Sequence, residues 1–252
     1  SGFISPVYDS GTGTISNAEL RTGTEVPSGY DYAINYYFGR QSYTLNFMDG
    51  MYVDGNNNMI QHRETQPLGT VSNVQYGTGL SHYSSTRYGC PENGYVFEGW
   101  YLDEACTSPV DWNTNMPLGG LTVYAKWRQI QYRVFLHPNA GTDNSLDWGS
   151  ETQAMNFRIS YGGRVSAPTG TRNGYTFVGW YLDEDCTQVF NADAFVLNEQ
   201  TVETAYDPTT HFTDPMDKWG NSATYSTDVG RFWITKELNL YGKWRATIEG
   251  AA

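Results

Sequence analysis

The stretch Asn93-Gly-Tyr-Val-Phe-Glu-Gly-Trp-Tyr-Leu-Asp-Glu-Ala-Cys-Thr107 occurs a second time, as Asn173-Gly-Tyr-Thr-Phe-Val-Gly-Trp-Tyr-Leu-Asp-Glu-Asp-Cys-Thr187. Twelve of the fifteen positions are identical, at a constant offset of 80 residues. Because self-similarity at a fixed spacing indicates one structural unit that is present more than once, this motif determines how the chain is organised.

Similar segments surround both copies of the motif. Each copy is preceded by an opening segment and followed by a closing segment. The openings are Tyr43-Thr-Leu-Asn-Phe47 and Tyr132-Arg-Val-Phe-Leu136, and the closings are Leu121-Thr-Val-Tyr-Ala-Lys-Trp127 and Leu238-Asn-Leu-Tyr-Gly-Lys-Trp244. The sequence therefore predicts repeat module 1 at residues 42–128 and repeat module 2 at 129–247. Module 2 has a longer connection before its closing segment, which we interpret as an insertion at about 199–235.

Within each module the apolar residues follow the period of a β-strand. In the first motif Tyr95 and Phe97 alternate with Val96 and Glu98, so successive side chains point to opposite faces. The pattern predicts a β-rich fold of mostly antiparallel sheet with at most short helices, one of them at 111–116. The four tryptophans that recur in the repeats are expected in the core, because each ring buries a large area: Trp100, Trp127, Trp180 and Trp244.

Composition limits the partners of the chain. Its 252 residues include 15 Lys and Arg against 27 Asp and Glu, which gives a formal net charge of −12. Such acidity disfavours binding to nucleic acid, whose phosphates are also negative. An aromatic content of 15% excludes a typical disordered segment. No apolar run approaches the roughly 20 residues of a membrane-spanning helix, so we expect no membrane insertion in this fragment.

The motif Gly-Tyr-x-Phe-x-Gly-Trp-Tyr, followed by Asp-Glu-x-Cys-Thr and by the closing segment, resembles the Listeria–Bacteroides repeat family. These are the internalin B-repeat-like modules of bacterial surface proteins. The resemblance implies an α+β, β-rich fold of tandem β-grasp (ubiquitin- or SUMO-like) modules in an extracellular, wall-attached or secreted protein. We interpret residues 1–41 as the end of a preceding extracellular module, or alternatively as a small domain.

No pattern for catalysis, a cofactor or a metal site is evident, so we expect a protein that is not an enzyme and has no cofactor. The three cysteines match no zinc spacing; a Cys90–Cys106 bridge and half-buried free thiols are both compatible with the sequence. The segment Asp54-Gly-Asn-Asn-Asn58 begins like a calcium loop, but it has Met59 where an EF-hand requires glycine. We expect a polar turn there.

The insertion carries aromatic residues that have no counterpart in module 1. Either these residues cap the sheet of their own module, or they contact a host protein, a matrix protein or a glycan. The candidate contact residues are Phe212, Trp219, Phe232 and Trp233. The leading hypothesis is the repeat region of an adhesin-type surface protein that acts as a spacer beside neighbouring modules and also binds protein. The alternatives are a carbohydrate-binding module of a larger secreted enzyme, or an enzyme that uses carboxylates.

Overall fold

The computed structural model describes residues 37–62, 64–141, 143, 145–148, 156–207 and 233–247, together with the backbone of three short strands nearer the N-terminus. These strands are β1 (Val7–Asp9), β2 (Thr14–Ser16) and β3 (Ala18–Glu19). β1 pairs antiparallel with β2, and β3 pairs antiparallel with β4 (Tyr37–Phe38). The segment predicted at 1–41 thus contains two small two-stranded sheets.

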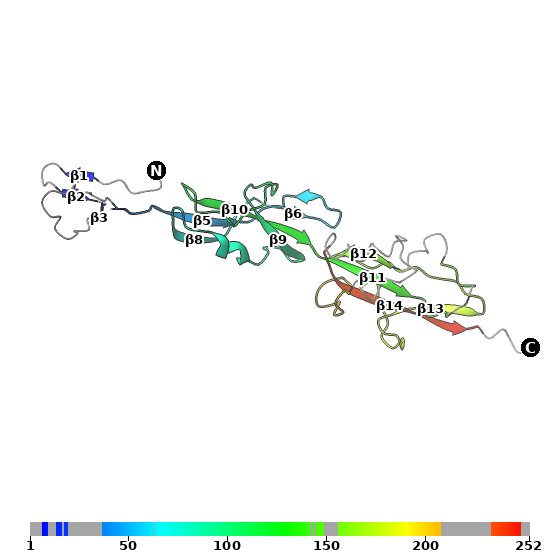
Figure 1. The fold of residues 1–252 in the computed structure, drawn as a ribbon. Coiled ribbons are helices and arrows are strands. Elements are labelled where there is room, and N and C mark those ends of the chain that lie inside the picture. The colour runs from blue at the N-terminus through cyan, green and yellow to red at the C-terminus, as the bar shows by residue number, and fades with distance from the viewer. Residues whose placement is uncertain are drawn as a thin grey trace, which may run out of the picture. The chain divides into compact units, whose positions relative to one another are not determined.

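Repeat 1 supplies a sheet of six strands (Figure 1). The strands are β5 (Ser42–Met48), β6 (Tyr52–Val53), β7 (Met59–Ile60), β8 (Pro67–Gln75), β9 (Tyr95–Tyr101) and β10 (Leu121–Gln129). Their order is β7-β6-β10-β5-β8, and β9 also pairs with β10. β10 runs parallel to β5 and β6, while β8 runs antiparallel to β5.

Repeat 2 supplies a sheet of four strands in the order β12-β11-β14-β13. They are β11 (Gln131–His137), β12 (Asn156–Ser160), β13 (Tyr175–Tyr181) and β14 (Ile234–Ala246). The opening strand β11 lies parallel to the closing strand β14, and β12 and β13 are antiparallel to their neighbours. The prediction of a β-rich fold is therefore confirmed, and both sheets are mixed, with a parallel pair at the centre.

The helix predicted at 111–116 is wrong. Among the described residues the helical segment is instead the short 3-10 helix η1 (Ser81–Ser85). The carboxylate of Asp111 accepts the backbone N–H of Asn113 at 2.9 Å, and Asn115 forms a β-bridge with Gly79. An aspartate that bonds its own backbone two residues on stabilises a turn in place of a helix.

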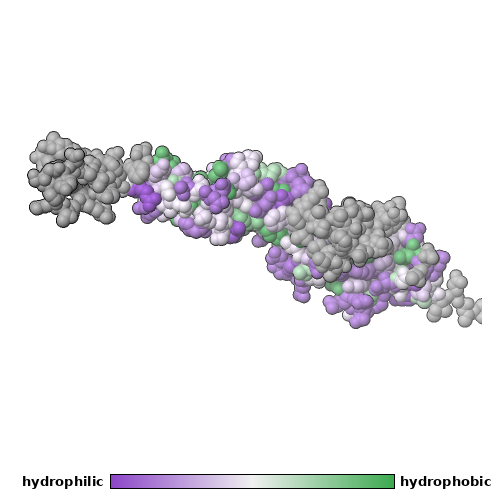
Figure 2. Space-filling model, in the orientation of Figure 1, coloured by the Kyte–Doolittle hydropathy of each residue, from purple (hydrophilic) through white to green (hydrophobic). Residues whose placement is uncertain are grey.

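The described chain forms two compact units that do not follow the order of the repeats. The first unit comprises 1–51, 61–89 and 97–126, and the second comprises 52–60, 90–96 and 127–252. The hairpin β6–β7 and the turn at 90–96 therefore belong with repeat 2, although both precede it in sequence. Figure 2 shows a surface on which hydrophilic residues predominate and apolar residues are scattered.

Each unit has an apolar core built from its sheet. In the first unit Leu45, Phe47 and Val123 are fully buried, and Trp100 is 4% exposed. The core of the second unit includes Tyr132, Val134, Leu197 and Leu240, which are fully buried, and Trp180, which is 6% exposed. Trp127 is also buried, and Trp244 is partly buried against the second core. The repeated tryptophans thus occupy the core positions expected of them.

Candidate functional site

The repeated motif serves mainly to anchor its tryptophan. The indole Nε1–H of Trp100 donates to the carbonyl of Thr86 at 2.9 Å, and that of Trp180 donates to the carbonyl of Pro168 at 2.8 Å. A buried indole N–H requires such a partner, because an unpaired donor in the core costs free energy. The motif therefore fixes a loop over each core and leaves the indole N–H engaged within the fold.

The acidic end of the motif is a turn organised by one carboxylate. Asp103 accepts hydrogen bonds from the backbone N–H and hydroxyl of Thr107 and from the N–H of Ser108, at 2.7–3.1 Å. Asp183 accepts the same set from Thr187 and the residue after it. These backbone hydrogen bonds lower the pKa of both carboxyl groups. The repeated aspartates stabilise the turns and are not available as an acid–base pair.

The cysteine of each motif is part of the same turn. Cys106 and Cys186 adopt positive φ angles of 52° and 54°, and their thiols are buried. Burial raises the pKa of the Cys106 thiol to about 11. All three cysteines are free, so the structure has free thiols and lacks the Cys90–Cys106 bridge. A buried, protonated thiol is a poor nucleophile.

The asparagine-rich loop after β6 is a polar turn, as expected. The carboxylate of Asp54 accepts the backbone N–H groups of Asn56 and Asn58, each at 2.8 Å. It also accepts the Nδ2–H of Asn58 at 2.9 Å. This carboxylate therefore closes the loop, and no set of three metal-ligating side chains is found among the described residues.

A depression of about 300 Å³ lies beside Trp100 in the first unit. Its aromatic rings are engaged in contacts within the unit. The guanidinium of Arg87 lies 4.6 Å from the centre of the Phe97 ring, and Trp112 stacks on the core residue Phe47 with 6.4 Å between ring centres. These rings pack within the unit and do not form an open platform for a ligand.

The passage from repeat 1 to repeat 2 contains one residue between strands. β10 ends at Gln129 and β11 begins at Gln131, so Ile130 alone connects them. The N–H of Ile130 donates to the carbonyl of Gly94 at 2.8 Å, and its carbonyl accepts the N–H of Tyr161 at 2.9 Å. Its side chain is 3% exposed and belongs to the core of the second unit. Both backbone groups and the side chain of Ile130 are therefore held within the second unit.

Two further contacts hold the β6–β7 hairpin to this joint inside the second unit. The guanidinium of Arg128 donates to the side-chain oxygen of Asn57 at 2.6 Å. The backbone N–H of Gly55 donates to the side-chain oxygen of Gln129 at 3.0 Å. Both bonds connect the end of β10 to the hairpin loop, so loop and joint form one bonded structure.

Only one of the four predicted contact residues lies within the described chain. Trp233 is half-buried directly before β14, and its carbonyl accepts the N–H of Gln131 at 3.4 Å. The guanidinium of Arg128 lies 5.9 Å from the centre of its ring. Trp233 is thus part of the joint in the second unit. Phe212, Trp219 and Phe232 lie outside the described residues.

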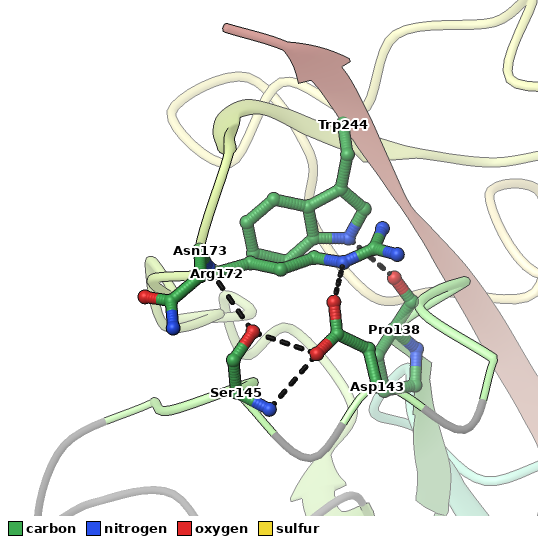
Figure 3. Close-up of polar contacts among 6 residues, drawn as sticks. All are labelled: Pro138, Asp143, Ser145, Arg172, Asn173 and Trp244. Atoms are coloured by element: carbon green, nitrogen blue, oxygen red, sulfur yellow. Dashed lines mark hydrogen bonds and ion pairs between the residues drawn. The ribbon is translucent and has the colours of Figure 1, made fainter.

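A polar network supports the last repeated tryptophan (Figure 3). The indole N–H of Trp244 donates to the carbonyl of Pro138 at 2.7 Å. Beside the ring, the Nε–H of Arg172 donates to Asp143 at 2.7 Å, and Ser145 donates both its hydroxyl and its N–H to the same carboxylate. The hydrogen bonds from Arg172 and Ser145 lower the pKa of Asp143 to about 2. The network ties a loop to the core.

Comparison with known proteins agrees with this geometry. The family model of the Listeria–Bacteroides repeat domain matches residues 66–126 and 137–205, one match in each repeat. The chain belongs to the Listeria–Bacteroides repeat domain family. Among its most similar relatives are two proteins of Evansella cellulosilytica, provisionally named a Gly-rich membrane protein and a membrane protein. Both are 28% identical to this repeat chain, over 119 and 112 residues.

These matches cover 47% and 44% of this chain, but only 12% and 15% of the relatives. The repeat chain thus corresponds to a small part of each relative. Within the described residues of the structure, no helix has the length and apolar character needed to cross a membrane.

Proposed function

We propose that this pair of Listeria–Bacteroides repeats is a spacer region of an extracellular, adhesin-type bacterial surface protein, with neighbouring modules on either side. The family assignment and the naming of its relatives as membrane proteins support a place at the cell envelope. The acidic surface supports solubility in an exposed position, because like-charged molecules repel one another. The partner proposed for the module is a protein or glycan outside the cell.

We further propose that each repeat is a β-grasp-like module in which turns replace the usual helix. In a β-grasp sheet the first and last strands lie side by side and parallel, with the hairpin partners outside them. The orders β8-β5-β10-β9 and β12-β11-β14-β13, each with a parallel central pair, support this assignment. Such modules, repeated in series, bury one core each and can be extended along a chain.

The observation that carries the spacer proposal is the packed joint at Ile130. A flexible linker exposes its backbone to water, whereas both backbone groups of Ile130 are hydrogen-bonded and its side chain lies in the core. A spacer requires such a joint, because free rotation at Ile130 would uncouple the end of β10 from β11.

Distances between spin labels in the two repeats test this proposal. Labels at Met59→Cys, on the β6–β7 hairpin of repeat 1, and at Thr176→Cys in repeat 2 are introduced together with Cys90→Ser; both positions are exposed and belong to the second unit. We expect a narrow distance distribution, and a broad one when Gly-Ser-Gly is inserted between Gln129 and Ile130. A parent protein whose distribution is as broad as that of the insertion variant would show that the repeats move freely and would refute the spacer role.

We also propose that the region is not an enzyme. Its motif carboxylates are engaged in turns and its motif thiols are buried. We expect no turnover on a panel of glycoside, ester and peptide substrates. Reproducible turnover that survives Asp103→Asn and Asp183→Asn would show that another group of the chain is catalytic.

A further inference from the structure

A second depression, of about 360 Å³, lies beside β14 in repeat 2. Its size is at the lower end of the range for small-molecule sites in proteins. One wall follows the end of β13 with Leu182 and Gln188, and the opposite wall is the segment 200–204 at the start of the insertion. Its floor is the stretch 237–239 of β14, with Tyr241 at one end.

The depression coincides with a break in the sheet along one edge of β14. On this edge β13 pairs with β14 from Tyr241 onward, and Ala205 forms a bridge with Lys236. Among the described residues, no pairing covers positions 238–240 on this edge. The N–H of Glu237 bonds to Thr204 on this edge, so Asn239, two residues further on, directs its own N–H and C=O into the break.

A line of hydrogen-bonded side chains lies along β14 and its neighbour β11. The Nδ2–H of Asn239 donates to the carboxylate of Glu237 at 3.1 Å. The side-chain oxygen of Asn239 accepts a hydrogen bond from the Nε2–H of His137 at 2.7 Å. His137 is the donor because the amide NH₂ of Asn239 faces Glu237, so the amide oxygen, which can only accept, faces His137. The His137 ring stacks on Tyr241, with 4.8 Å between ring centres. The line therefore fixes the orientation of the Asn239 amide on the floor of the depression.

Repeat 1 shows that the shared fold does not require these residues. Met48 pairs with Tyr124 in repeat 1 as His137 pairs with Tyr241 in repeat 2, so the positions are equivalent. Counting from the closing segments, repeat 1 has Thr122 in place of Asn239, and Gly120 in place of Glu237. The polar line is thus found in the repeat that also has the insertion as a wall. Stability of the common module does not explain it.

We propose that this depression is a binding site for a compact, neutral, hydroxyl-rich ligand, which is a saccharide of one or two rings. Planar side-chain amides offer adjacent donors and acceptors to neighbouring hydroxyls: Asn239, Gln188 and Gln200. Leu182 and the Tyr241 ring supply apolar surface for the C–H groups of a sugar ring. No other described residue hydrogen-bonds the side-chain amides of Gln188 and Gln200, which leaves both available.

The geometry favours this ligand over a peptide or a cation. The three unpaired positions 238–240 of β14 span about 10 Å. The end of β13 closes the break at one end and the 200–204 segment closes it at the other, so an extended peptide strand has no path through it. The lining contains the carboxylates of Glu203 and Glu237, but the Glu237 carboxylate already accepts the Asn239 amide. Most of the remaining polar groups are neutral.

Saturation-transfer NMR on the whole chain tests the proposal. The probes are glucose, galactose, mannose, N-acetylglucosamine and their β-linked disaccharides, with butylamine as a cation and acetyl-Val-Thr-Val-amide as a peptide. The variant is His137→Met with Asn239→Thr, which introduces the residues that repeat 1 carries at these positions and so fits the fold. Thr122→Asn in repeat 1 is the matched control.

We expect transfer to at least one saccharide, a dissociation constant raised at least about tenfold in the double variant, and no change in the control. Circular dichroism shows whether each variant is folded, and Gln188→Ala, a change at an exposed side chain of the lining, serves as a second variant that should also weaken saccharide binding. Three results would overturn the proposal: no saccharide bound by the parent protein, saccharide binding unchanged in the folded double variant, or binding of the amine or peptide alone. This site is separate from the spacer role, because the spin-label distances do not depend on it.

Discussion

Replacement of Gly94 by alanine measures how tightly the joint between the repeats is packed. Gly94 has a φ of 81°, and a Cβ added there would lie 2.3 Å from the Tyr161 ring. Gly174 occupies the equivalent position of repeat 2, has a φ of 75°, and has no atom within 4 Å of an added Cβ. The two variants therefore share the backbone penalty and differ in the clash.

The backbone penalty of an L-residue at positive φ is about 1–2 kcal/mol, partly offset by about 0.4–1 kcal/mol because alanine restricts the unfolded chain. We expect Gly174→Ala to cost about 1 kcal/mol. Overpacking of a ring adds roughly 1–3 kcal/mol, so Gly94→Ala should cost about 2–4 kcal/mol. The clash also displaces the carbonyl of Gly94, which accepts the N–H of Ile130.

Native-state hydrogen exchange, followed by mass spectrometry on peptides from β11 and β14, measures both variants in the same unit. Exchange resolves a single unit, which a global melting curve of a two-unit chain does not. Equal losses of protection in the two variants, within about 0.5 kcal/mol, would mean that Tyr161 does not pack on Gly94. Such a result would contradict the tight packing of the joint, even with both proteins folded.

Three other predictions concern the cores and the loops. Trp180→Ala should destabilise repeat 2 by about 3–5 kcal/mol, measured by hydrogen exchange on peptides from β11 and β14, because it empties a buried site against Trp148; a loss below about 1 kcal/mol would place the ring at the surface. Cys106 and Cys186 should resist a thiol reagent at pH about 8 until the chain unfolds, since both thiols are buried and the pKa of Cys106 is raised to about 11. Rapid labelling of either residue would contradict their burial. The depressed pKa of Asp143 contributes stability that is present above its unfolded value of 3.8 and is lost as the pH falls toward about 2. Asp143→Asn should flatten this acid limb, and an unchanged pH profile would exclude the Arg172 contact as its cause.

The sequence was sufficient to predict the repeats, their strands and their tryptophan cores, because alternation and repetition are local signals. Trp100 and Trp180 lie where the pattern placed them. The strand pattern, which predicts mostly antiparallel sheet, did not give the parallel central pairs, because β5 and β10 are far apart in sequence and no local pattern records which strands become neighbours. Only the resemblance to β-grasp modules implied such pairs. The helix at 111–116 failed because one carboxylate stabilised a turn.

The candidate sites were harder to predict for the same reason. Four aromatic residues were chosen because they had no counterpart in repeat 1, and of these Trp233 alone lies within the described residues. The same comparison, applied to polar residues, would have marked Asn239 and His137, whose equivalents are Thr122 and Met48. The difference between the repeats was therefore visible in the sequence. Its meaning depended on β11 and β14 being neighbours, which brings Nε2 of His137 to 2.7 Å from the side-chain oxygen of Asn239.

In a chain with two copies of one module, each copy can be compared with the other, and this comparison separates residues needed for stability from residues needed for function. Residues that are identical in both copies, such as the anchoring tryptophans and the turn aspartates, have structural partners in both and so need no ligand to explain them. Polar residues that differ between copies at equivalent, partly buried positions need another explanation, because burying a polar group without benefit costs free energy. Asn239 is half-buried where repeat 1 has Thr122, so the fold tolerates the position without an amide. A free-energy cost of burying a polar group in one copy alone is expected where that copy has a function that the other copy lacks.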